Sequence, residues 1–177
     1  MYGSESIVIL GMSCVGKTTF AKRIADYGEH QYRCFDALYN WHEIETFGFS
    51  IKHAMQHVVR QCHNEKFVLD GWHLACTQGC LLPKNASTYV LYSGYSRIIS
   101  QYRIPVVSFY QHWHMFQKWY LEVDYTQFPR VEYWENTGQF EKRSEAEFLS
   151  FCASQSRSPQ TEDQAGMKGS SPSPCEF

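Results

Sequence analysis

The sequence predicts a single α/β domain built on parallel strands. Apolar runs typical of buried strands recur along the chain, and the first, at residues 6–10, leads through a glycine-containing loop into an amphipathic helical pattern. A later apolar run, at residues 66–69, ends in an aspartate. The length of 177 residues and the hydrophobic content of 44% suit one domain with a full core. Open sheets of this class bind their ligands at the carboxyl ends of the strands.

The loop after the first apolar run is the strongest functional signal. Residues 11–18 read Gly-Met-Ser-Cys-Val-Gly-Lys-Thr and match the phosphate-binding pattern G-x-x-x-x-G-K-[ST] at every fixed position. Its glycines let successive backbone N–H groups point into one concavity, and the following helix adds its positive N-terminal end. We expect Lys17 to reach the β- and γ-phosphates and the Thr18 hydroxyl to hold Mg²⁺. The predicted nucleotide-binding residues of the loop are Gly11, Ser13, Cys14, Val15, Gly16, Lys17, Thr18 and Thr19.

The helix after this loop extends to about Tyr27, with an apolar stripe that includes Phe20 and Ile24. Residues 31–35 then read as a short strand that ends in Asp36. A carboxylate at the end of a strand lies where such sheets place their ligands. We therefore favour a functional role for Asp36 over a role as a turn or cap residue.

An aromatic, irregular stretch follows and is a candidate acceptor-binding segment, within the range of about 37–63. It contains Tyr39, Trp41 and His42. The next strand, at 66–69, delivers Asp70, followed by Gly71. An aspartate at this point, paired with the phosphate loop, is expected to contact Mg²⁺ or to orient its water shell.

The second half of the chain predicts two more strands and several helices. A strand at 88–92 precedes a segment that carries Arg97 and Arg103, which are either a clamp for phosphoryl charge or solubilising surface residues. A helix from Ser108 has an aromatic packing stripe. A fifth strand at 130–134 and a helix that starts with a capping box at 144–147 complete the domain. The serine- and proline-containing tail, 154–177, is expected to be disordered.

Composition narrows the function classes. The formal charge of -2 gives no electrostatic reason to expect tight binding to nucleic acid, although a local basic groove is compatible with it. No apolar run approaches the roughly 20 residues of a membrane span, and the amino terminus has no secretory pattern. The seven scattered cysteines read as reduced thiols. These features predict a soluble, cytoplasmic protein with no membrane contact and no obligate protein partner.

From residue 5 to about 153 this order of motifs resembles the P-loop kinase superfamily, which includes nucleoside monophosphate kinases and polynucleotide 5'-kinases. The resemblance implies a P-loop NTPase fold, a three-layer sandwich with a five-stranded parallel sheet in the order 2-3-1-4-5. It also implies ATP and Mg²⁺ as cofactors and a lid at about 94–125 that carries Arg97 and Arg103. The adenine pocket would be formed partly by Asn136 and Thr137, after the fifth strand.

The acceptor is predicted from a departure from the family pattern. Monophosphate kinases usually carry Asp-Gly-Phe-Pro-Arg, whose arginine grips the acceptor phosphate, whereas residues 70–74 here read Asp-Gly-Trp-His-Leu. An acceptor hydroxyl needs a carboxylate that takes its proton, and Asp36 occupies the place of that base in kinases that phosphorylate hydroxyl groups. The expected acceptor-binding residues are Asp36, Tyr39, Trp41, His42, Asp70 and Trp72.

The aromatic residues around this site favour a nucleoside-like ring. Such an acceptor is a hydroxymethylated pyrimidine in DNA, as in phage-type DNA-modification kinases, or a 5'-hydroxyl. Three alternatives remain at this point: a monophosphate kinase, a nucleotide-dependent switch or regulatory ATPase, and a nucleic-acid-binding module. The sequence lacks the Asn-Lys-x-Asp run of guanine-nucleotide switches.

Overall fold

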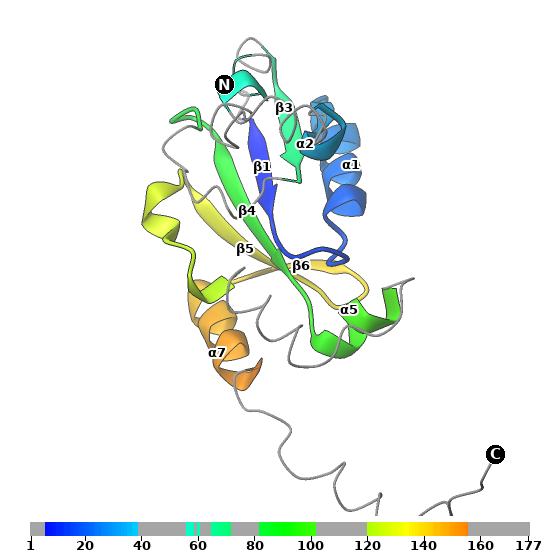
Figure 1. Cartoon of the computed structure of the whole chain (residues 1–177), viewed down its shortest axis with the longest axis vertical. Coiled ribbons are helices and arrows are strands. Elements are labelled where there is room, and N and C mark those ends of the chain that lie inside the picture. Colours follow the sequence, from blue (N-terminus) through cyan, green and yellow to red (C-terminus); the bar gives the residue numbers. More distant parts are fainter. Residues whose placement is uncertain are drawn as a thin grey trace, which may run out of the picture.

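The computed structural model describes residues 6–38, 56–58, 60, 65–71, 82–101 and 120–155. Figure 1 shows the elements in these ranges, which form one sheet with helices packed around it. In chain order they are β1 (Ile7–Leu10), α1 (Lys17–Gly28), β2 (Gln31–Cys34), α2 (Phe35–Leu38), β3 (Phe67–Asp70), β4 (Ser87–Tyr92), α5 (Tyr95–Gln101), the 3-10 helix η4 (Tyr125–Gln127), β5 (Val131–Asn136), β6 (Phe140–Arg143) and α7 (Glu145–Gln155).

The sheet has the order β2-β3-β1-β4-β5-β6. The first five strands are parallel, so the predicted order 2-3-1-4-5 is confirmed. The sixth strand was not predicted. It pairs antiparallel with β5 through a hairpin in which Asn136 faces Phe140, and Gly138 turns the chain with a φ of 124°. The predicted loop after the fifth strand is therefore the turn of a hairpin.

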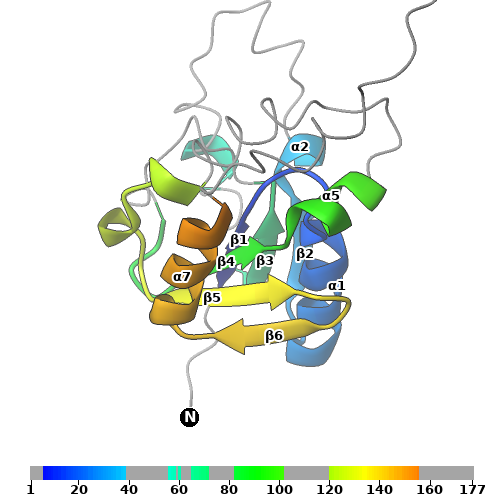
Figure 2. The same ribbon diagram turned by 90° about the horizontal axis from the view of Figure 1, so that it is seen from below.

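Two separate hydrophobic cores lie on the two faces of the sheet. On one face α7 contributes Phe148, whose ring stacks on Tyr133 of β5 with 4.5 Å between centroids. On the other face α1 contributes Phe20, which is 4% exposed. Figure 2 shows α7 and α1 on opposite sides of the sheet, as in a three-layer sandwich. None of the helices in the described ranges is long and apolar enough to cross a bilayer.

Two predicted boundaries are wrong. Strand β2 ends at Cys34, and the chain turns helical at Phe35, whose side chain is completely buried. Asp36 thus belongs to the short helix α2 and does not end a strand. Helix α7 continues to Gln155, so the first two residues of the predicted tail are helical.

Candidate active site

The phosphate loop connects β1 to α1, and its two fixed glycines have geometries that only glycine accommodates. Gly11 has a φ of 149°, and a Cβ there would lie 2.3 Å from the backbone oxygen of Leu91. Gly16 has a φ of 98°, and a Cβ there would lie 2.8 Å from Nδ2 of Asn136. Beneath the loop, Met12 and Val15 are buried in the two cores. The loop is therefore held by the geometry of its glycines and by packing into both cores.

A cleft of about 290 Å³ brings the predicted loop residues together with Asp70. The cleft lies at the carboxyl ends of β1, β2 and β3, as expected for a parallel sheet. Its lining residues are Ser13, Cys14, Gly16, Lys17, Thr18, Thr19, Cys34, Asp70 and Gly71.

Lys17, Thr18 and Asp70 already have partners in this cleft. The Lys17 ammonium donates to the carbonyl oxygen of Met12 at 2.7 Å, so the side chain folds back over its own loop. The Thr18 hydroxyl donates to Oδ2 of Asp70 at 2.7 Å, and Asp70 is only 2% exposed. A hydroxyl and a carboxylate side by side are hard oxygen ligands, which suit Mg²⁺ when phosphates and water supply the rest. The residues present therefore fit the metal that the phosphate loop implies.

Tyr32 and Cys34, both on β2, were not singled out from the sequence. The Tyr32 hydroxyl donates to Oδ1 of Asp70 at 3.2 Å, so both carboxylate oxygens of Asp70 are held. Burial, and then the charge of Asp70, raise the pKa of Tyr32, which keeps the hydroxyl a donor at neutral pH. Burial also raises the pKa of the Cys34 thiol. The only sequence signal for either residue was its position on the strand next to the one that ends in Asp70.

A second cleft, of about 440 Å³, lies between the start of α5 and the end of β5. It brings together three predicted residues, Arg97, Asn136 and Thr137. The Arg97 guanidinium lies against the hairpin turn, 3.3 Å from where a Cβ on Gly138 would be. Its Nε is buried and makes no hydrogen bond to any residue in the described ranges. A flat cationic group beside a polar cleft offers a stacking surface for a nucleobase.

Asn136 has a different environment from the exposed Thr137. Its side chain is almost fully buried and faces the phosphate loop, where Nδ2 donates to the carbonyl oxygen of Val15 at 2.9 Å. Its Oδ1 accepts from the backbone N–H of Gly138 at 3.2 Å. The contact of Asn136 with the loop also places the two clefts next to each other.

Tyr120 supports the phosphate loop through hydrogen bonds, although the sequence indicated only an aromatic packing stripe in the helix predicted from Ser108, to which Tyr120 belongs. Its hydroxyl donates to the carbonyl oxygen of Leu91 at 2.8 Å and accepts from the backbone N–H of Met12 at 3.2 Å. The side chain is 2% exposed, and burial raises the pKa of its hydroxyl. The bridge therefore links the end of β4 to the first turn of the loop.

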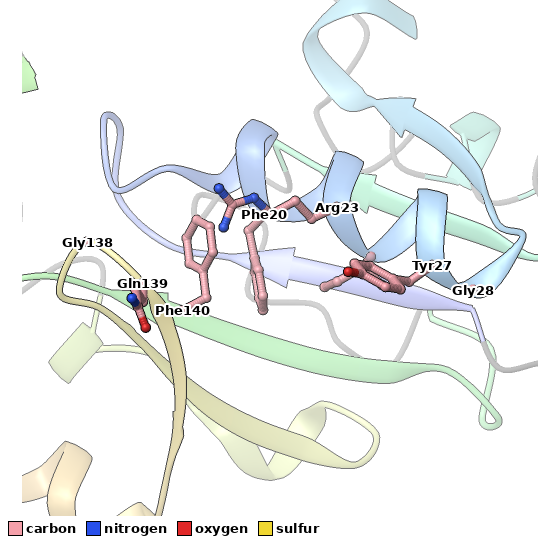
Figure 3. Close-up of a pocket in the computed structure, with 8 residues that line it drawn as sticks. Phe20, Arg23, Tyr27, Gly28, Gly138, Gln139 and Phe140 are labelled. Carbon is pink, nitrogen blue, oxygen red and sulfur yellow. The ribbon is translucent and has the colours of Figure 1, made fainter.

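A larger hollow, of about 810 Å³, lies along the outer side of α1. Figure 3 shows Phe20 and Arg23 of α1 facing Phe140 of the hairpin, with Tyr27 farther along the helix. The rings of Phe20 and Phe140 stack at 4.6 Å, and the Arg23 guanidinium lies 5.3 Å from the centre of the Phe140 ring. These contacts attach the β5–β6 hairpin to the first turns of α1.

Several predicted site residues have no described environment. Tyr39, Trp41, His42, Trp72 and Arg103 lie outside the described residues. Asp36 is placed only by its backbone in α2. The acceptor-binding segment and the lid are described in part only, and their roles stay predictions.

Comparison with solved structures identifies the fold. A scan against protein-family models and a search of curated proteins both found no match. The chain is similar to a gluconokinase from Sinorhizobium meliloti 1021, with a TM-score of 0.57 and 14% identity over 86% of this chain and 91% of that one. A sugar kinase from Janibacter sp. HTCC2649 gives a TM-score of 0.53 and 15% identity, covering 73% and 85%. The chain thus shares an α/β fold with these two proteins, and its described sheet includes a sixth, antiparallel strand.

Proposed function

We propose that this chain is an ATP- and Mg²⁺-dependent kinase that transfers the γ-phosphoryl group to an acceptor hydroxyl. The observation that carries the proposal is the cleft in which the phosphate loop faces Asp70. There the Thr18 hydroxyl lies 2.7 Å from Oδ2 of Asp70. The adjacent cleft beside Arg97 supports a place for the base of the same nucleotide. The shared fold with a gluconokinase and a sugar kinase supports this class of reaction.

The residues of the two clefts have distinct tasks in this proposal. The loop amides and the start of α1 bind the phosphates, and Lys17 leaves the Met12 carbonyl to neutralise the charge of the β- and γ-phosphates. Thr18 and Asp70 would hold Mg²⁺, which would supply positive charge beside the phosphates. Arg97, which the sequence suggested as a clamp for phosphoryl charge, stacks on the base in this proposal because it lies beside the second cleft, and Thr137 lines the same cleft.

In the transfer step, the acceptor oxygen forms a bond to the γ-phosphorus while the bond from that phosphorus to the β,γ-bridging oxygen breaks. The hydroxyl proton passes to a carboxylate, for which Asp36 is the proposed base. Arg103 adds positive charge to the transferred group in this scheme. ADP is the leaving product, so atoms and charges balance.

The acceptor is proposed to present a hydroxyl because residues 70–74 lack the arginine that grips an acceptor phosphate. In the sequence, the aromatic residues that follow Asp36 and Asp70, among them Tyr39 and Trp72, favour a nucleoside-like ring, including a hydroxymethylated pyrimidine in DNA. A sugar or sugar acid is the second candidate, which the gluconokinase and sugar kinase with the same fold favour.

A transfer assay tests the proposal. The protein is incubated with Mg²⁺, ATP labelled at the γ-phosphorus, and separate acceptors: gluconate and hexoses, nucleosides, nucleoside monophosphates, DNA with 5'-hydroxyl ends, and DNA with hydroxymethylated pyrimidines. Lys17→Ala should abolish transfer, whereas Lys84→Ala, an exposed lysine in the turn before β4, is the matched control and should keep it. Label on a hydroxyl compound supports the proposal.

Other outcomes overturn it in different ways. Label found only on monophosphates would replace the hydroxyl acceptor with a phosphate acceptor. Tight ATP binding with no transfer to any acceptor, and hydrolysis stimulated by a partner protein, would favour the regulatory ATPase.

A further inference from the structure

The side chain of Asn136 has a fixed orientation at the end of β5. Its Oδ1 accepts from the Gly138 N–H, so its amide nitrogen must be the atom that faces the phosphate loop. This pattern sets the two ends of the carboxamide, which otherwise look alike. The group that meets the loop is therefore a donor, and its acceptor is the Val15 carbonyl oxygen at 2.9 Å.

This contact determines the direction of the next backbone N–H. In a planar trans peptide the C=O of one residue and the N–H of the next point in opposite directions. Because the Val15 carbonyl points at Asn136, the Gly16 N–H points away from Asn136. Gly16 lines the phosphate cleft, so this N–H is available on the side where a phosphate would lie.

Gly16 has no side chain that would oppose a flip of the Val15–Gly16 peptide. Glycine adopts positive and negative φ with similar ease, and Gly16 has a φ of 98°. A flipped peptide would turn a carbonyl oxygen toward the cleft and repel an anion. The hydrogen bond from Asn136 favours the orientation that binds one.

We propose that Asn136 is a positioning residue that holds the Val15–Gly16 peptide with its N–H toward the phosphates. The inference rests on the proposed function, because it needs a nucleotide in this loop. It assigns Asn136 a role through the loop backbone, in place of the predicted contact with adenine.

The β5–β6 hairpin keeps Asn136 in place. The Ser93 hydroxyl donates to the backbone oxygen of Asn136 at 2.7 Å, which ties the residue to the chain after β4. Beyond the turn, Phe140 stacks on Phe20 in the first turns of α1, as Figure 3 shows. Through Phe140, the hairpin that carries the Asn136 carboxamide is packed against α1, the helix that begins directly after the loop. The sixth strand therefore has a task at the phosphate site although none of its residues lines that cleft.

Two substitutions separate this role from a contact with the base. Asn136→Asp keeps the shape but replaces the donor with an oxygen that repels the Val15 carbonyl and accepts from a flipped Gly16 N–H. Asn136→Ala removes the hydrogen bond without favouring the flip. We expect Asn136→Ala to weaken binding of both MgATP and inorganic tripolyphosphate by about tenfold, and Asn136→Asp to weaken both more. Gln139→Glu adds the same charge to the exposed hairpin turn and is the matched control, with affinities within about twofold of wild type.

Calorimetric titration of the full chain with MgATP and with tripolyphosphate measures these affinities. If the Asn136 variants lost affinity for MgATP but bound tripolyphosphate like wild type, Asn136 would act on the base and the inference would be wrong. Unchanged affinity for both ligands would also overturn it. If the wild type bound neither ligand, the proposed function would fail, and the inference with it.

A measurement on the wild type keeps the test independent of how well the variants fold. In protein labelled with ¹⁵N-glycine, the Gly16 amide resonance should move on addition of tripolyphosphate. An assigned Gly16 resonance that did not respond while the ligand bound would exclude the proposed orientation.

Discussion

Removal of the Tyr120 hydroxyl tests whether the phosphate loop depends on a brace from a distant part of the chain. In Tyr120→Phe the ring still packs in the core, but the bridge between the Met12 N–H and the Leu91 carbonyl is lost. Both backbone groups contact the Tyr120 side chain, which is only 2% exposed, so water does not readily replace the hydroxyl. An unmet buried donor or acceptor costs about 1–3 kcal/mol, so the two together cost about 2–6 kcal/mol of the free energy of unfolding.

Thermal and urea denaturation measure this loss. For a chain of this size, about 2–6 kcal/mol corresponds to a fall in the melting temperature of about 4–24 °C. The affinity for MgATP should fall as well, because Met12 lies at the start of the loop that binds the phosphates. Burial raises the pKa of Tyr120, so the hydroxyl stays protonated and the effect should not vary between pH 6 and 8, a range about two units or more below the usual tyrosine pKa.

Tyr125→Phe is the matched control. The Tyr125 hydroxyl donates to the backbone oxygen of Tyr120 at 3.2 Å and does not contact the loop. This variant should lose some stability and keep the affinity for MgATP. If Tyr120→Phe were as stable as wild type and bound MgATP equally well, the bridge would contribute nothing and the reasoning would be refuted.

Three further predictions follow from the cleft and from α7. Asp70→Asn should remove most of the Mg²⁺ dependence of ATP binding, so that its affinity for ATP in the presence of Mg²⁺ falls by about tenfold or more. Titrations with and without Mg²⁺ measure this dependence, and a variant that kept it would contradict the metal assignment. Because burial raises the pKa of the Cys34 thiol, its alkylation by iodoacetamide at pH 7.5 should be slower than that of free cysteine. MgATP should slow the alkylation further, because Cys34 lines the cleft, and peptide mass spectrometry measures both rates. Fast alkylation that nucleotide did not change would place Cys34 away from the cleft. Hydrogen bonds from the Ser144 backbone and hydroxyl lower the pKa of Glu147 from its usual value of 4.5. The ionised carboxylate therefore stabilises the fold above pH 4.5, and this stabilisation is lost as the pH falls through the pKa that Glu147 has in the folded protein. Glu147→Gln should therefore make the unfolding midpoint less sensitive to acid, and an unchanged pH profile would show that this carboxylate is irrelevant to acid unfolding.

The sequence predicted the parts of the fold that local patterns specify. The phosphate loop fixes a strand before it and a helix after it, and Asp70 marks the end of another strand, so the central strands were correct. Their order was implied by the resemblance to the P-loop kinase superfamily and is confirmed. Strand β6 was missed because Phe-Glu-Lys-Arg is short and charged, and it forms because Gly138 permits the turn and Phe140 packs on Phe20. Asp36 was assigned to a strand end because the change to helix at Phe35 carries no sequence signal.

The braces of the site were beyond prediction for a different reason. Tyr120 is 108 residues from Met12, and Asn136 is 121 residues from Val15. A tyrosine in an aromatic stripe looks like any packing residue until its hydroxyl meets a backbone group of the folded chain. Only the tertiary structure shows which side chains support the loop.

The hairpin also determines how the sheet ends. As the outermost strand in the described sheet, β6 carries Glu141, Lys142 and Arg143, and all three are in ion pairs, Lys142 with Glu132 and Arg143 with Glu135 and Glu141. Charged side chains along a border strand disfavour the addition of a strand from another molecule, because those charges would lose water and their partners. The strand whose Phe140 attaches the hairpin to α1 thus also disfavours edge-to-edge aggregation at this border of the sheet.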